Sequence, residues 1–256
     1  MRARILQHVP FESPGSIAPT LRSLGASVET TRLFSGEVLP AAADVDLLVI
    51  MGGPMSVNDE AEHPWLVDEK ALVAEAIVNG RAVLGVCLGA QVIASALGYP
   101  VFKNREPEIG WFPIQPTVDG EAVGLNGSGC VFHWHGETFD LPEGAIHLAE
   151  SAACPNQAFE VEFDGGPARG GALLLALQFH LEATEGSVRM MYEGQREELA
   201  REAAATGSPT LAESALVGEP ARYAPLRPLL DDLLDRLTAP RASFRDASGA
   251  TAPRTR

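Results

Sequence analysis

Cysteine is scarce in this sequence, and long apolar runs are absent. The 256 residues include three cysteines, Cys87, Cys130 and Cys154, which lie far apart and form no C-x-x-C pair. An odd, widely spaced set is typical of reduced thiols rather than of a disulfide framework. No run approaches the roughly 18 apolar residues of a membrane-spanning helix, and the N-terminal segment has no signal-peptide core. We therefore expect a cytoplasmic protein outside the membrane.

Basic residues are also few. The chain has 19 lysines and arginines against 34 aspartates and glutamates, a formal net charge of -15 at pH 7. Such an acidic surface repels phosphate backbones and anionic lipid, which argues against nucleic-acid and membrane-surface partners. Neither G-x-G-x-x-G nor G-x-x-x-x-G-K-[ST] is present, and we expect no cofactor. With 46% hydrophobic residues, the composition is typical of a folded α/β protein.

Apolar segments typical of strands alternate with helical patterns over residues 3–99. This alternation indicates βαβ units and a mainly parallel sheet. Residues 101–165 contain short β-like pieces separated by Gly and Pro, which we expect to decorate one side of the sheet. The run "GALLLALQFHLE" at 171–182 predicts a late buried strand, and a helical pattern follows to about residue 237. The last residues are polar and predict a disordered tail.

Cys87 lies in "RAVLGVCLGAQVIASAL", where a strand pattern turns sharply into a helix pattern. A side chain at such a junction projects from the carboxyl edge of a parallel sheet, where sites of open α/β sheets lie. The positive end of the following helix favours a thiolate there. Gly85 and Gly89 remove side chains that would crowd the turn. A buried core cysteine is the alternative, and this stretch alone leaves the two interpretations equally open.

A nucleophile needs a base, and His180 is the best placed of the six histidines. It ends the buried run, and Glu182 follows two residues later on the same side of an extended segment. A carboxylate there can orient the imidazole and stabilise its charged form. Upstream, a strand ends in Gly52-Gly53-Pro54, whose backbone N–H groups can face an oxyanion.

The segment "HWH" places His133 and His135 on one face of a strand, with Glu137 nearby. No established metal-binding spacing supports a metal site there, and we expect none.

Taken together, "MGGPMSV", "GVCLGAQ", "EIGW", "WHGETF" and "QFHLE" strongly resemble the class I glutamine amidotransferases, in particular the amidotransferase domain of GMP synthase and its stand-alone relatives. The resemblance covers roughly residues 5–185. It implies a flavodoxin-like fold with a mainly parallel central sheet and flanking helices, carrying an extra β-rich segment. We predict an amidotransferase domain over residues 1–185, a C-terminal helical appendage packed on it over 186–240, and the disordered tail over 241–256.

The resemblance also implies a role for each matched residue. Cys87 would be the nucleophile, His180 the base and Glu182 its orienting carboxylate. The oxyanion hole would consist of the N–H groups of Gly53 and Leu88. The substrate-binding residues would be Gly52, Gln91, Trp134, His135, Gly136 and Glu137. This chain has Leu181 where the family usually has proline, which removes a rigid φ between His180 and Glu182.

Three functions from different classes remain open at this stage. The first is hydrolysis of glutamine to glutamate and ammonia through a Cys87 thioester. We expect no synthetase domain within this chain, so the ammonia would pass to an acceptor subunit in trans or to none. The second is a stand-alone γ-glutamyl hydrolase, and the third is a non-catalytic regulatory module. A DJ-1/PfpI-type cysteine protein shares the strand–Cys–helix junction but not the His180–Glu182 pair. A homodimer through the C-terminal helices also remains open.

Overall fold

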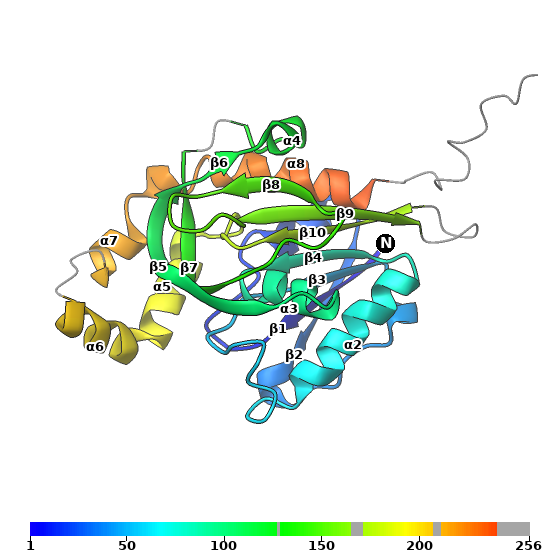
Figure 1. The fold of residues 1–256 in the computed structure, drawn as a ribbon, viewed down its shortest axis with the longest axis horizontal. Coiled ribbons are helices and arrows are strands. Elements are labelled where there is room, and N and C mark those ends of the chain that lie inside the picture. The colour runs from blue at the N-terminus through cyan, green and yellow to red at the C-terminus, as the bar shows by residue number, and fades with distance from the viewer. Residues whose placement is uncertain (127–128, 165–170, 207–210, 240–256) are drawn as a thin grey trace, which may run out of the picture.

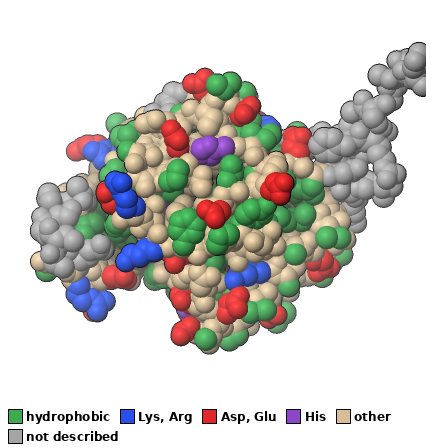
Figure 2. All heavy atoms as spheres, in the orientation of Figure 1, with side chains coloured by type: hydrophobic (Ala, Val, Ile, Leu, Met, Phe, Trp, Pro, Cys, Tyr) green, Lys and Arg blue, Asp and Glu red, His purple; other side chains and the backbone are tan. Residues whose placement is uncertain are grey.

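The computed structural model describes residues 1–126, 129–164, 171–206 and 211–239. The predicted disordered tail over 241–256 lies outside these residues. Among the described helices, none has the length and apolar character needed to cross a membrane. On the face drawn in Figure 2, acidic and basic side chains are interspersed with apolar ones, and basic residues form no continuous stripe.

An eight-stranded sheet forms the centre of the molecule, in the order β2-β1-β3-β4-β10-β9-β8-β6 (Figure 1). The first five strands in this order are parallel to one another. They show the 2-1-3-4-5 arrangement of flavodoxin-like folds, which confirms the predicted fold class. Their bounds are Ser27–Arg32 for β2, Arg2–Gln7 for β1, Leu47–Ile50 for β3, Ala82–Val86 for β4 and Gly171–Leu177 for β10.

Helices cover both faces of the parallel strands. Helices α1 (Ile17–Ser23) and α8 (Leu226–Thr238) pack on one face, while α2 (Trp65–Val78) and α3 (Leu88–Ala96) pack on the other. Because neither face meets water, the central strands are apolar throughout, and every side chain of β3 is buried. The two apolar clusters that fill these layers form the core.

The β-rich segment differs from the prediction that it decorates one side of the sheet. Strands β9 (Ala158–Asp164), β8 (Ile146–Glu150) and β6 (Gln115–Pro116) extend the sheet in its own plane by antiparallel pairing. Strands β5 (Val101–Pro113) and β7 (Cys130–Phe139) form a separate antiparallel ribbon, with α4 (Val118–Ala122) between β6 and β7 in the chain. Antiparallel pairing needs no crossover helix, so it can add strands at the sheet edge.

The C-terminal residues form α5 (Glu185–Gly194), α6 (Arg196–Thr206), α7 (Glu213–Val217) and α8. Helix α8 is amphipathic, and its leucines enter the same apolar cluster as side chains of β1 and β10. Arg236 of α8 also pairs with Glu160 of β9. Helix α8 is therefore packed on the sheet, whereas the division at residue 185 into a domain and an appendage stays a prediction. Short 3-10 turns occupy Leu33–Ser35, Ala42–Asp44 and Pro220–Arg222.

We expect Leu233→Ala to lower the free energy of unfolding by about 2–5 kcal/mol, because this side chain is buried between α8 and the sheet. Asp235→Ala, at an exposed position of the same helix, is the matched control and should change the stability by less than about 0.5 kcal/mol. Urea denaturation of both variants measures the difference. Equal stabilities would show that α8 does not contribute to the core in solution.

Candidate active site

Cys87 lies at the turn between β4 and α3, at the carboxyl edge of the parallel strands. Its φ of 54° makes it the sole non-glycine residue with positive φ in the described part of the chain. A conformation of this kind costs on the order of 1–3 kcal/mol and is concentrated at functional sites. Its N–H donates to the carbonyl of Leu177 on β10, and its side chain is 5% exposed. The strained turn therefore holds the thiol at the base of a pocket.

Gly85 and Gly89 permit this turn by allowing α3 to approach the sheet closely. A Cβ on Gly85 would lie 2.4 Å from the carbonyl oxygen of Gly89, and one on Gly89 would lie 2.1 Å from that of Ile50. Both contacts are with backbone atoms, which cannot move aside without shifting the helix or the strand. The structure thus explains why glycine occurs on both sides of Cys87.

His180 and Glu182 lie beyond the end of β10, as an oriented pair. His180 Nδ1 is 2.7 Å from Glu182 Oε1, and both side chains are buried. The backbone N–H of His180 donates to the carbonyl of Phe132 on β7, and the two residues form an isolated β-bridge. Strand β10 ends at Leu177, before the end of the predicted strand, and the chain bends at Leu181 and Glu182. Leu181 stands where the family usually has proline, and its side chain is buried in the core. The predicted arrangement of His180 and Glu182 on one side is confirmed.

The pKa values of His180 and Cys87 depend on burial, on the Glu182 carboxylate and on the proximity of the two groups to each other. Burial acts to lower the pKa of His180, but the carboxylate of Glu182 and the nearby thiol outweigh it, and the pKa is raised well above the ordinary value. Burial raises the pKa of Cys87, while His180 and the N–H of Leu88 act to lower it. The N–H of Leu88 at the start of α3 thus acts in the direction expected of the helix N-terminus, and desolvation of the buried thiol opposes it.

Cys87 and His180 lie close enough that each shifts the pKa of the other. The thiol donates to the carbonyl of Trp134 at 3.4 Å, and no described atom is in hydrogen-bond geometry with His180 Nε2. Hydrogen bonds between catalytic groups often become shorter when a substrate binds. His180 Nε2 is therefore free to take the proton of the thiol or to deliver one to a leaving group.

A pocket of about 640 Å³ opens above Cys87. Its lining includes most of the residues predicted for the oxyanion hole and the substrate, namely Gly53, Gln91, Trp134, His135, Gly136 and Glu137. Gln91 on α3 donates to the carbonyl of Glu137 and to Gln178, which ties the helix to β7. Four of the predicted residues are not part of this lining, namely His180, Glu182, Gly52 and Leu88. The structure therefore brings the widely separated motifs to one place.

The Gly52-Gly53 turn is held by a buried ion pair that sequence reasoning missed. His8, just after β1, contacts the carbonyl of Gly52 through Nδ1 at 3.0 Å and Glu69 of α2 through Nε2 at 2.9 Å. Burial acts to lower the pKa of His8, but Glu69 and the Gly52 carbonyl raise it above the ordinary value. A charged imidazole donates to both partners and so fixes the turn. One indication of this contact was present in the sequence, since His8 lies at the end of a predicted strand.

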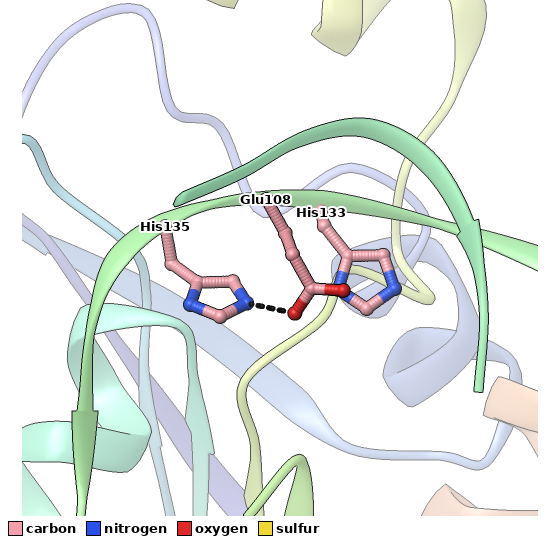
Figure 3. Close-up of side chains that lie close together, drawn as sticks. All are labelled: Glu108, His133 and His135. Atoms are coloured by element: carbon pink, nitrogen blue, oxygen red, sulfur yellow. Dashed lines mark ion pairs between the residues drawn. The ribbon is translucent and has the colours of Figure 1, made fainter. Parts of the chain in front are cut away.

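Glu108, His133 and His135 form a buried cluster beside the pocket, with one ligand atom of each within 4.8 Å of the others. Figure 3 shows the Glu108 carboxylate between the two imidazole rings. It lies 3.2 Å from His135 Nε2 and also accepts hydrogen bonds from Ser151 and Gln157. Burial lowers the pKa of His133 to about 3, so this ring is neutral. The cluster holds His135 in the pocket wall through its own hydrogen bonds, and the expected lack of a metal stays a prediction.

Other pocket residues also went unrecognised in the sequence. Glu12 lies in the loop after β1, and Lys103 and Arg105 lie on β5. The pocket is also lined by Gln195, which follows α5, and by Glu198 of α6. Nothing in their local sequence marks these residues, because elements far apart in the chain bring them together. The C-terminal helices thus contribute directly to the pocket.

The sequence profile of the family "Glutamine amidotransferase class-I" matches residues 15–193, well over half of the chain. The chain belongs to this family. Its thiol–imidazole–carboxylate site at a strand-to-helix turn is the type of site that cysteine-dependent amidohydrolases use. The resemblance predicted from the motifs is therefore confirmed, whereas the roles of individual residues stay proposals.

The chain is similar to several known proteins in sequence and in structure. The glutamine amidotransferase-like protein YfeJ of Salmonella typhimurium is 34% identical over 208 residues, which cover 78% of this chain and 83% of YfeJ. GMP synthase of Alteromonas mediterranea is 33% identical over 54% of this chain, but the match spans only 25% of that enzyme. The crystal structure of a glutamine amidotransferase from Thermotoga maritima superimposes with a TM-score of 0.78 at 28% identity, covering 93% of this chain and 97% of that one.

We expect Gly89→Ala to abolish the site, since its Cβ would collide with the Ile50 carbonyl and push α3 away from the sheet. Reactivity of Cys87 toward a glutamine-like diazoketone, followed by mass spectrometry, should fall by at least about 100-fold, together with a loss of thermal stability. Gly186→Ala, where a Cβ would meet only Thr184 at 4.0 Å, is the control and should label like wild type. Normal labelling of Gly89→Ala would contradict the close-packing argument.

Proposed function

We propose that this chain hydrolyses the side-chain amide of glutamine to glutamate and ammonia through a γ-glutamyl thioester on Cys87. The observation that carries the proposal is the oriented His180–Glu182 pair beside a strained, pocket-facing cysteine. The intact arrangement supports an enzyme over the alternative of a non-catalytic module. The family match is to the class-I glutamine amidotransferases and does not support the DJ-1/PfpI-type alternative.

In the first step the Cys87 proton moves to His180, and the sulfur attacks the amide carbon. The carbonyl oxygen becomes an oxyanion, which the N–H groups of Gly53 and Leu88 would stabilise. In the described part of the chain, no acceptor takes the Gly53 N–H. His180 then protonates the amide nitrogen, the C–N bond breaks with its electrons leaving on nitrogen, and ammonia departs.

In the second step a water molecule attacks the thioester carbon. His180 accepts the proton of the water, and the carbon–sulfur bond breaks to release glutamate and restore Cys87. Glu182 keeps the imidazole oriented through Nδ1 and stabilises its charged form in both steps. Ammonia could then pass to a synthetase subunit in trans, as the likeness to one segment of GMP synthase suggests.

A larger γ-glutamyl compound is the second candidate substrate, and the size of the pocket favours it. A volume of about 640 Å³ lies within the roughly 300–1,000 Å³ of sites that hold drug-sized ligands. The lining includes the basic residues Lys103 and Arg105 and the acidic residues Glu137 and Glu198. Side chains of both signs could hold the charged groups of a peptide as well as those of a free amino acid.

We expect Cys87→Ala to reduce glutaminase activity by roughly 1,000-fold or more, because no other nucleophile lies at the turn. Ammonia and glutamate release by the purified protein measure the effect. Cys130→Ala is the matched control, since this thiol is exposed at the start of β7 and should not affect turnover. A γ-glutamyl adduct on Cys87, detected by mass spectrometry after acid quenching, should accompany turnover. Activity that survives in Cys87→Ala would overturn the proposal.

Comparison of substrates separates the two candidate functions. If a γ-glutamyl peptide fills the outer pocket, its kcat/KM should exceed that of glutamine by about tenfold or more, because additional contacts contribute to binding. Glutamate release from both compounds at equal concentration gives the ratio. A ratio below one would assign the chain to glutamine and leave the outer pocket to a partner subunit.

A further inference from the structure

Glu12 is a third carboxyl group at the catalytic centre, in addition to Glu182 and Glu137. The loop after β1 carries it across the carboxyl edge of the sheet, where it lines the pocket together with Cys87 and Gly53. The loop is held to the triad, since the N–H and hydroxyl of Ser16 donate to the backbone carbonyl of Glu182. Glu12 is 5% exposed, so its position is determined by packing rather than by solvent.

No described residue forms a hydrogen bond or an ion pair with the carboxyl group of Glu12, and its oxygens are not among the fully buried atoms that lack a partner, since Glu12 lines the pocket. Burial without a donor is costly for a carboxylate, and burial raises the pKa of Glu12 to about 7. Four titratable groups surround it: His8 of the same loop after β1, Cys87 after β4, and His180 and Glu182 after β10. A carboxyl group that lines a pocket and receives no donor from the protein can accept a hydrogen bond from a bound ligand.

The reacting groups restrict which donor this can be. A Cβ on Gly52 would lie 2.1 Å from Glu12 Oε2 and 3.4 Å from His180 Cε1, so both side chains converge on the bare Cα of Gly52. Glu12 is therefore beside the imidazole that delivers a proton to the leaving nitrogen. The carbonyl oxygen of the substrate needs donors, which Gly53 and Leu88 offer and Glu12 cannot. The amide N–H is the remaining donor at the reacting carbon.

We infer that Glu12 accepts a hydrogen bond from the nitrogen of the scissile amide, and so selects substrates whose leaving atom is a nitrogen that carries hydrogen. This inference rests on the proposed function. As His180 protonates that nitrogen and the C–N bond lengthens, positive charge develops on nitrogen and its attraction to the carboxylate grows. The electrons of the C–N bond leave on nitrogen, and Glu12 itself transfers no proton.

Two properties follow from this contact. An ester of the same acyl group has no N–H at the leaving atom, so it gains nothing from Glu12. The product glutamate places a second carboxylate where the amide was, and like charges at this distance repel one another in a buried site. Glu12 therefore favours glutamine over glutamate in binding and promotes product release.

The kinetic test compares glutamine with glutamate γ-methyl ester in wild type and Glu12→Gln. We expect kcat/KM for glutamine to fall roughly 10- to 100-fold, as for loss of a charge-assisted hydrogen bond, and that for the ester to change less than about threefold. In wild type the glutamine-to-ester ratio should rise with pH through about 7, because the carboxylate form increases there, and it should be flat in Glu12→Gln. Glu62→Gln, an exposed position, is the control.

A merely structural role predicts a different result. Both substrates would then lose activity equally, the pH dependence of the ratio would persist, and Glu12→Gln would unfold at a lower temperature. Either an equal loss or no loss on glutamine overturns the inference. A wild-type protein that hydrolyses neither compound would instead count against the proposed function.

A binding measurement tests the inference without turnover. In the Cys87→Ala background at pH 8, calorimetry should show glutamine bound at least about tenfold more tightly than glutamate. Adding Glu12→Gln should abolish that preference by strengthening glutamate binding. If the preference persists in the double variant, or is absent before the change, Glu12 does not recognise the amide nitrogen.

Discussion

Helix α3 can lie against β3 and β4 only because Gly85 and Gly89 carry no side chain where helix and strand meet. That approach forces the residue between them into a positive φ and directs its thiol out of the sheet edge. Strain at Cys87 is stable because the surrounding backbone is over-determined: β10 holds its N–H and the core holds α3. The other active-site groups can act only if they lie at the right distance from this sulfur, so the site depends on its fixed position.

Two carboxylates near one imidazole have different roles because their environments differ. Glu182 bonds His180 Nδ1 directly and stabilises the charged ring. Glu12 has no such partner, and burial holds its pKa near neutrality, at about 7. Gly52 leaves room for Glu12 beside the imidazole ring, because it carries no side chain there.

The walls of the pocket depend on buried polar contacts rather than on apolar packing alone. His8 and Glu69 hold the turn of Gly52 and Gly53, and Glu108 holds His135. Such networks rigidify a site when their members are satisfied, and they are costly when they are broken. The outer wall comes from β5 and from α5 and α6, so a C-terminal region without catalytic motifs still shapes what can bind.

The order of strands and helices, the parallel half of the sheet and the cysteine turn were predictable from sequence, because periodicity and glycine placement are local properties. The pairing of His180 with Glu182 was also predictable locally, since the two residues are two positions apart in the chain and their side chains are in contact. Tertiary structure alone decided the edge position of β6, β8 and β9, the sign of the Cys87 pKa shift, and the meeting of Glu12 with His180. Burial and long-range contact set these features, and neither is encoded in a short stretch of sequence.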